Sequence, residues 1–119
     1  MLGRAFQEVL SEAPECRILA LGRGELDIAE RENVLGLAPE NPDIIIHCAA
    51  YVNAEGCEEN PDLCHAVQVE GSRNVADLAT KAGAKILYPQ SFLIFDGKTN
   101  PITEETPPAP QSVYGRRKL

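Results

Sequence analysis

The chain has 119 residues, which is enough for one domain and too few for two. Eighteen Asp and Glu against eleven Lys and Arg give a net charge of −7, which opposes nucleic-acid binding because phosphates need a clustered basic surface. The apolar runs are far too short to span a bilayer, so we expect a globular protein with no membrane partner. The N-terminus lacks the long apolar stretch of a secretory signal, and we therefore expect a cytoplasmic location.

Hydrophobic spacing predicts alternating helices and strands in the first half of the chain. Leu2, Phe6 and Val9 recur at helical spacing, so residues 3–12 are expected to form an amphipathic helix. A short buried strand is expected over residues 17–22, and a second helix over residues 29–38. The apolar run of residues 43–50 has no polar alternation, which suits a parallel strand covered on both faces.

The second half continues the same alternation. Pro61 opens a long helical pattern that is expected to end at Gly83, a plausible C-cap residue. Residues 85–91 are predicted to form another strand, residues 96–112 a surface loop, and residues 113–119 the beginning of a helix. This order favours an α/β fold with a parallel sheet and right-handed crossovers.

The four cysteines are interpreted as reduced thiols, because no export signal accompanies them. They are Cys16, Cys48, Cys57 and Cys64. A metal cluster of Cys57, Cys64 and His65 with His47 and Cys48 is the alternative. The spacings match no zinc pattern, so we expect no metal site.

A tyrosine and a lysine, Tyr114 and Lys118, lie four residues apart at the start of the last predicted helix. At this spacing they share one helix face, and a nearby ammonium favours the phenolate, which makes the phenol a better proton donor. Ser91 follows a strand end, where α/β sheets carry functional groups, and its hydroxyl can bond a carbonyl oxygen. Together they predict a carbonyl reductase site. The alternatives are a solvated helix turn for the pair and a loop-capping hydroxyl for Ser91.

Five ordered segments of the chain carry a family resemblance: Leu2-Gly-Arg-Ala5, Glu25-Leu-Asp-Ile28, Pro42–Tyr51, Ile94-Phe-Asp-Gly97 and Pro110–Leu119. Their order and spacing resemble the dTDP-4-dehydrorhamnose reductase family of extended short-chain dehydrogenase/reductases. The resemblance implies a three-layer Rossmann-type parallel sheet, NADPH as cofactor with NADH left open, and reduction of a 4-keto sugar attached to dTDP. It also leaves a homodimer open.

The resemblance further implies roles for individual residues. Tyr114 would donate the proton, Lys118 would hold the nicotinamide ribose, and Ser91 would bond the sugar carbonyl. The implied cofactor-binding residues are Gly3, Arg23, Asp27, Ile28, Ala49, Ala50, Tyr51 and Lys118. For Arg23 a solvated strand-end side chain is the alternative.

The sequence departs from the family pattern at several positions. Phe92 and Leu93 stand where the family has an acid and a substrate-facing tyrosine, and Gln68 stands where it has an asparagine. Of the glycine-rich phosphate turn only Gly3 is present, so residues 1–119 are predicted to be a partial NAD(P)-binding Rossmann domain without its first strand and its C-terminal part. We expect such a chain to bind NADPH poorly and to have no measurable reductase activity.

Two other functions stay open at this point. The beta subunit of methionine adenosyltransferase is similar to the same family and acts by binding a partner enzyme, so this chain could be a non-catalytic binding subunit. A truncated product without activity is the third alternative.

Overall fold

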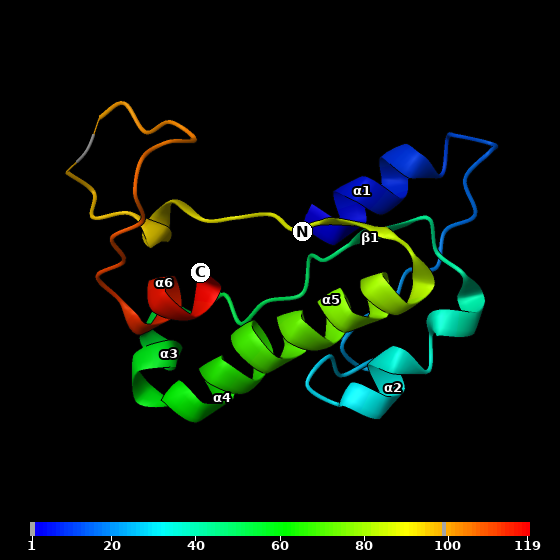
Figure 1. Ribbon diagram of the computed structural model, residues 1–119, viewed down its shortest axis with the longest axis horizontal. Helices are drawn as coiled ribbons and strands as arrows, with labels where there is room; N and C mark the ends of the chain where they lie inside the picture. The colour runs from blue at the N-terminus through cyan, green and yellow to red at the C-terminus, as the bar shows by residue number, and fades with distance from the viewer. Residues whose placement is uncertain (1, 99) are drawn as a thin grey trace.

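The computed structural model describes residues 2–98 and 100–119, and in it helices alternate with two short strands (Figure 1). The elements are α1 (Leu2–Leu10), α2 (Arg31–Leu35), η1 (Ala38–Glu40), β1 (Ile44–Ile46), α3 (Ala54–Glu59), α4 (Pro61–His65), η2 (Ala66–Glu70), α5 (Gly71–Ala82), β2 (Lys85–Leu87), η3 (Phe92–Ile94) and α6 (Val113–Lys118). This order confirms the predicted α/β class, and the loop predicted over residues 96–112 contains no helix or strand among its described residues.

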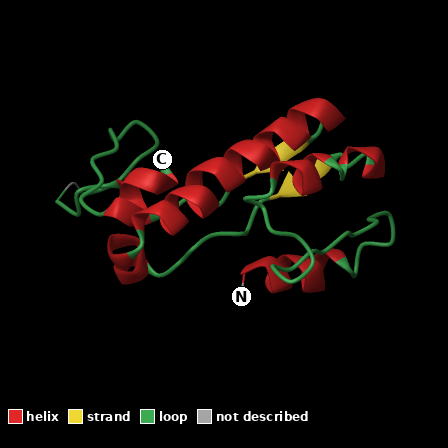
Figure 2. Cartoon of the chain, turned by 90° about the horizontal axis from the view of Figure 1, so that it is seen from below, coloured by secondary structure: helices red, strands yellow, loops and turns green. Residues whose placement is uncertain are grey.

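The sheet consists of β1 and β2, which pair in parallel with Ile45 opposite Ile86. The ladder continues at both ends, where Lys85 N donates to Asp43 O at 2.8 Å and His47 N donates to Leu87 O at 2.9 Å. In both views α5 lies on one side of the strands and α1 on the other (Figures 1 and 2). Because the two strands are parallel, their carboxyl ends meet at one edge of the sheet, as in other parallel α/β sheets.

The main core joins α2 and α5. Ile28, Val34, Val75 and Leu78 are its buried members. Asn74 Nδ2 on α5 donates to the backbone oxygen of Ile28 at 2.9 Å, which satisfies a buried carbonyl in the segment before α2. A Cβ atom on Gly71 would lie 2.6 Å from Ile28 Cδ1, so glycine permits the close approach.

The long helical stretch that begins at Pro61 ends as predicted. Helices α4, η2 and α5 follow one another without a break, and η2 is a π-helical segment. Gly83 has φ 69°, and the N–H of Ala84 donates to Ala79 O at 2.8 Å. These features form a Schellman cap, which needs a left-handed residue that glycine adopts without steric cost.

The prediction of a strand over residues 17–22 is wrong. This segment pairs with no other described strand, and Ile18, Leu19 and Leu21 are between 37% and 53% exposed. A strand needs a neighbour for its backbone groups, and local sequence does not supply one. The strands predicted over 43–50 and 85–91 are present but shorter, with three paired residues each.

Two helices also differ from prediction. The helix expected over 29–38 is divided into α2 and η1, and Pro39 lies inside η1. Helix α3 was missed altogether, although Asn53 caps it by accepting from Gly56 N at 3.0 Å. Asparagine is a strong N-cap residue, so the sequence did contain a signal for this helix.

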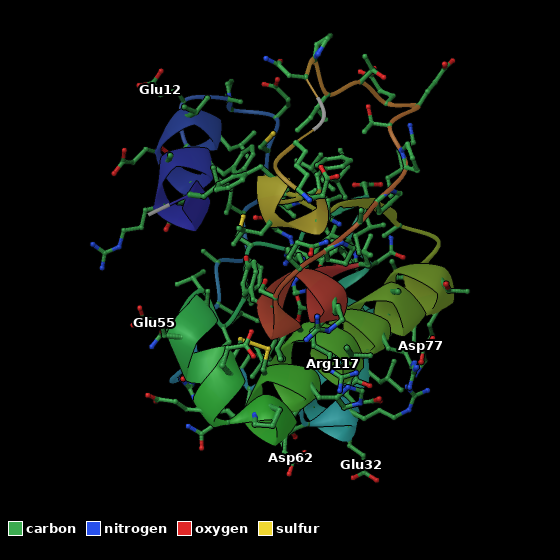
Figure 3. All side chains as sticks on the ribbon, turned by 90° about the vertical axis from the view of Figure 1, so that its left-hand side faces the viewer. Glu12, Glu32, Glu55, Asp62, Asp77 and Arg117 are labelled. Carbon is green, nitrogen blue, oxygen red and sulfur yellow. A yellow bond between two sulfur atoms is a disulfide. The ribbon has the colours of Figure 1, made fainter. Side chains whose placement is uncertain are left out.

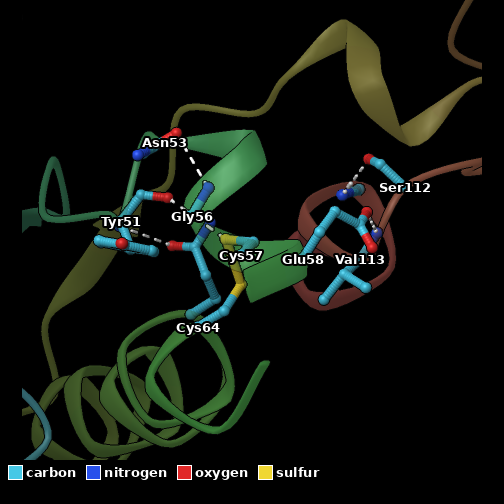
Figure 4. The surroundings of a disulfide bond; sticks show 10 residues. Tyr51, Asn53, Gly56, Cys57, Glu58, Cys64, Ser112 and Val113 are labelled. Carbon is cyan, nitrogen blue, oxygen red and sulfur yellow. Dashed lines mark hydrogen bonds between the residues drawn. A yellow bond between two sulfur atoms is a disulfide. The ribbon is translucent and has the colours of Figure 1, made fainter. Parts of the chain in front are cut away.

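A second core contains a disulfide between Cys57 of α3 and Cys64 of α4 (Figure 4). Two of the four cysteines are therefore not the reduced thiols that the sequence predicted, while Cys16 and Cys48 are free. The chain turns sharply between α3 and α4 at Asn60, which brings the two Cα atoms to 5.1 Å, a usual separation for a disulfide. Both cysteines are fully buried, and Tyr114 packs against them.

Acidic side chains are spread over the surface rather than gathered on one face. Figure 3 shows them pointing outward from separate elements: Glu12, Glu32, Glu55, Asp62 and Asp77. Within the described residues, no helix is long and apolar enough to cross a membrane. No group of three or more His, Cys, Asp or Glu in the same residues is arranged to hold a metal ion.

Candidate functional site

Helix α6 lies against η3, the short helix that follows β2 in the chain. Its N-cap is Ser112, whose hydroxyl oxygen accepts from Gly115 N at 3.0 Å. A Cβ atom on Gly115 would collide with the backbone oxygen of Leu93, so only glycine allows this contact. The close packing buries Tyr114 and Lys118, which are 7% and 5% exposed. The solvated helix turn, the alternative considered for this pair, is therefore wrong.

The ammonium of Lys118 faces an aromatic ring. Its Nζ lies 3.9 Å from the centroid of the Tyr88 ring, a cation–π distance. No described residue gives this ammonium a carboxylate or another hydrogen-bond acceptor. The three N–H donors of a buried cation are therefore available to a ligand.

Tyr88 belongs to a cluster with two other polar side chains. Its ring stacks on His47, with centroids 5.1 Å apart and planes 11° from parallel. Ser72 Oγ on α5 lies 3.0 Å from His47 Nε2 and 3.3 Å from Tyr88 Oη, so one hydroxyl joins both rings. We call Tyr88, His47 and Ser72 the Tyr88 cluster.

The electrostatics at this edge of the sheet follow from burial and from Lys118. Burial, reinforced by the nearby ammonium, lowers the pKa of His47 to about 4, so its imidazole is neutral at pH 7. Burial raises the pKa of the Cys48 thiol, and the same ammonium opposes part of that rise. The Lys118 ammonium therefore acts to lower the pKa of two consecutive residues that follow β1, His47 and Cys48.

Ser91 lies beside α6 through its neighbour Gln90, whose Nε2 donates to Lys118 O at 3.0 Å. The Ser91 hydroxyl oxygen accepts from Leu93 N at 3.3 Å and so caps η3, as the alternative interpretation expected. Accepting this bond leaves the hydroxyl proton free to be donated. The cap and a role toward a carbonyl oxygen are therefore compatible.

The loop after β1 approaches the same edge. Tyr51 packs in the second core with Tyr114, Ala50 is half-buried, and Ala49 is exposed. Gln68 is 2% exposed and accepts from Tyr51 N at 3.3 Å, so it holds this loop even though it replaces the family asparagine. Its Nε2 has no partner among the described residues.

The remaining predicted cofactor residues lie in the first quarter of the chain. Gly3 is an exposed residue inside α1, and Arg23 is exposed in the turn before α2. Asp27 Oδ1 accepts from Ala29 N at 3.0 Å, and Ile28 is a buried member of the main core. Their cofactor roles stay predictions, as do those of the residues nearer α6.

A nicotinamide dinucleotide fits part of this arrangement. An ammonium with free donors suits ribose hydroxyls, and the small side chains of Ala49 and Ala50 follow the end of β1. The fit therefore covers the nicotinamide ribose end of the cofactor.

Sequence reasoning missed the residues around Lys118. His47 entered it only as a metal candidate, and Tyr88 and Ser72 had no assigned role. Tyr88 stands three residues before Ser91, which was the available signal.

The fold places the chain in the Rossmann-like α/β class of reductase structures. A dTDP-4-dehydrorhamnose reductase from Bacillus anthracis, solved in complex with NADP, matches 98% of this chain and 42% of its own length, with 36% identity and a TM-score of 0.91. A structure of the same name from Clostridium acetobutylicum matches 98% of this chain and 42% of its own length, with 33% identity and a TM-score of 0.93.

Sequence comparison identifies the family. The family model described as the RmlD substrate binding domain matches residues 1–119, and the chain belongs to this family. A dTDP-4-dehydrorhamnose reductase from Streptomyces griseus is 34% identical over 99% of this chain and 39% of its own length. The chain thus spans about two fifths of that relative. Methionine adenosyltransferase 2 subunit beta from Xenopus laevis is also 34% identical, over 100% of this chain and 38% of its own length.

Proposed function

We propose that these residues form the proton-donating part of a cytoplasmic, NADPH-dependent short-chain reductase that converts dTDP-4-dehydrorhamnose to dTDP-L-rhamnose. The observation that carries this proposal is the buried residue Lys118, whose ammonium has no hydrogen-bond acceptor among the described residues and which lies one helical turn after Tyr114. The relatives named as reductases and the NADP complex of one of them support the same function.

Each residue has a defined role in this reaction. When bound, the reduced nicotinamide supplies a hydride to the carbonyl carbon. Tyr114 donates its phenolic proton to the carbonyl oxygen, and Ser91 donates a hydrogen bond to that oxygen. The Lys118 ammonium stabilises the phenolate that remains on Tyr114 and binds the ribose hydroxyls.

Cofactor binding is the first test of this proposal. Saturation-transfer difference NMR, which also detects weak binding, can measure NADPH binding on the whole 119-residue chain. Lys118→Met should weaken NADPH binding about tenfold, the worth of hydrogen bonds from a charged donor. Tyr114→Phe should leave binding unchanged, because the phenol acts on the substrate. An affinity that does not change in Lys118→Met would contradict the proposal.

Catalysis is best tested in a hybrid, since the chain spans about two fifths of the Streptomyces griseus relative. Residues 85–119 would replace the matched segment of the Streptomyces griseus relative. The hybrid should oxidise NADPH with dTDP-4-dehydrorhamnose, and Tyr114→Phe in it should reduce the rate by about 10²-fold or more. An equal rate in the two hybrids would refute the role of Tyr114.

A non-catalytic binding subunit is the second candidate function. The ring of Phe92 is 76% exposed at a position where the family has an acid, and exposed aromatic rings favour protein contacts. The similarity to methionine adenosyltransferase 2 subunit beta supports this candidate. Co-purification with a methionine adenosyltransferase catalytic subunit, lost in Phe92→Ser but kept in Tyr114→Phe, would favour it over the reductase.

A further inference from the structure

We propose that Tyr88 is a positioning residue, which holds the Lys118 ammonium against its ring face while His47 and Ser72 fix the ring. This inference rests on the proposed reductase function for its purpose, but not for its geometry.

Lys118 is only 5% exposed as a residue, so most of its side chain is fixed by packing. Among the described residues the partner of its ammonium is the Tyr88 ring, at 3.9 Å from Nζ. A ring face attracts a cation through its quadrupole and accepts no conventional hydrogen bond. It therefore locates the charge without occupying the N–H donors that a carboxylate would occupy.

The ring of Tyr88 is itself held in place from two directions. The stacked His47 ring sets its plane, and the Ser72 hydroxyl lies within hydrogen-bond distance of both Tyr88 Oη and His47 Nε2. Ser72 is on α5, while His47 and Tyr88 each follow a strand. Two other segments, α5 and the residue after β1, therefore fix the ring that follows β2, which is how a positioning group is kept rigid.

The position of Lys118 matters because Tyr114 lies four residues earlier on the same helix. In the proposed reaction a displaced ammonium would weaken both the ribose contact and the stabilisation of the phenolate. In this proposal Tyr88 acts on the reaction through Lys118, the residue whose ammonium its ring contacts.

The first experiment is spectroscopic and needs no cofactor. Aromatic rings shield protons above their faces, so the Lys118 CεH₂ signal of the whole chain should be shifted upfield, with its assignment taken from Lys118→Met. Tyr88→Leu should abolish the shift, and Tyr88→Phe should keep it because the ring remains. Phe6→Leu is the matched control, since it removes a ring from α1, far from α6 in Figure 1.

The second experiment measures NADPH binding by saturation transfer. Tyr88→Leu should weaken binding about tenfold, whereas Tyr88→Phe and Phe6→Leu should not. In the background of Lys118→Met, Tyr88→Leu should cause no further loss, because the two residues act through one another.

The outcomes separate this inference from the proposed function. An unshifted Lys118 signal in the wild-type chain, or a shift that survives Tyr88→Leu, overturns the inference whatever the cofactor result. A ring-dependent shift with no NADPH binding supports the geometry and contradicts the reductase. If Tyr88→Leu does not fold, Ser72→Ala replaces it, and a Lys118 shift that stays at the wild-type value there would overturn the role of the cluster.

Discussion

The buried imidazole of His47 makes the stability of this chain depend on pH in a calculable way. Its pKa is lowered from 6.5 to about 4 by burial and, second, by the Lys118 ammonium. In the unfolded chain the same imidazole takes up a proton near pH 6.5, so between pH 6.5 and 4 the unfolded state binds more protons than the folded state. The free energy of unfolding must therefore fall as the pH is lowered through this range.

The size of the loss follows from the shift. Each pKa unit corresponds to about 1.4 kcal/mol, so the full shift sets an upper limit of about 3 kcal/mol, reached below pH 4. Residual solvent around the ring reduces this limit, and we expect a loss of about 2 kcal/mol between pH 7 and pH 4.

Urea unfolding followed by circular dichroism measures this loss when the wild type and His47→Gln are compared at pH 7, 5.5 and 4. The carboxylates titrate in both proteins, so their effect cancels in the difference between the two free energies of unfolding. The advantage of the wild type at pH 7 should shrink by about 2 kcal/mol at pH 4. A difference that is constant over this range, or an imidazole titration of His47 near pH 6.5 by NMR, would refute the reasoning.

Three further predictions concern the packing around α6. Replacing both Cys57 and Cys64 by Ala should lower the free energy of unfolding by about 2 to 3 kcal/mol in urea, since the disulfide closes a short loop of sequence separation 7; equal stability would show that the two thiols are not linked. Gly115→Ala should cost about 3 kcal/mol or more by thermal unfolding, because its Cβ collides with the Leu93 carbonyl oxygen, and a neutral result would mean that α6 lies further from η3. Ser112→Ala should cost about 1 kcal/mol by losing the N-cap, whereas Ser112→Asp should preserve it.

Local signals in the sequence were sufficient for the elements whose causes are local. Gly83 marks the end of α5 because the cap needs a left-handed residue, and the run Ile44–Ile46 marks β1 because it has no polar alternation. The segment 17–22 has a similar apolar run but no described partner strand. Strand formation depends on a neighbouring strand to pair with, so the apolar pattern of residues 17–22 alone could not decide whether they form a strand.

The site was predictable only in part, for the same reason. The spacing of Tyr114 and Lys118 is local, and the structure places both on the buried side of α6. The contact between Lys118 and Tyr88 joins residues thirty positions apart, and His47 and Ser72 come from two further elements. The helix break at Asn60 was a local signal for the disulfide. The lack of an export signal, however, favoured reduced thiols.

The placement of charges in this chain supports the role proposed for the Lys118 ammonium in cofactor binding and proton transfer. Eighteen acidic residues are present, and each ion pair between described residues has side chains that are at least 40% exposed. The buried cation contacts a ring instead. A carboxylate beside it would hold its N–H donors and compete with a phenolate for its charge. A stabilising role alone would favour a paired cation, because breaking or omitting a buried pair is costly. An ammonium that is fixed in place and left with free donors suits the role proposed for Lys118 beside Tyr114.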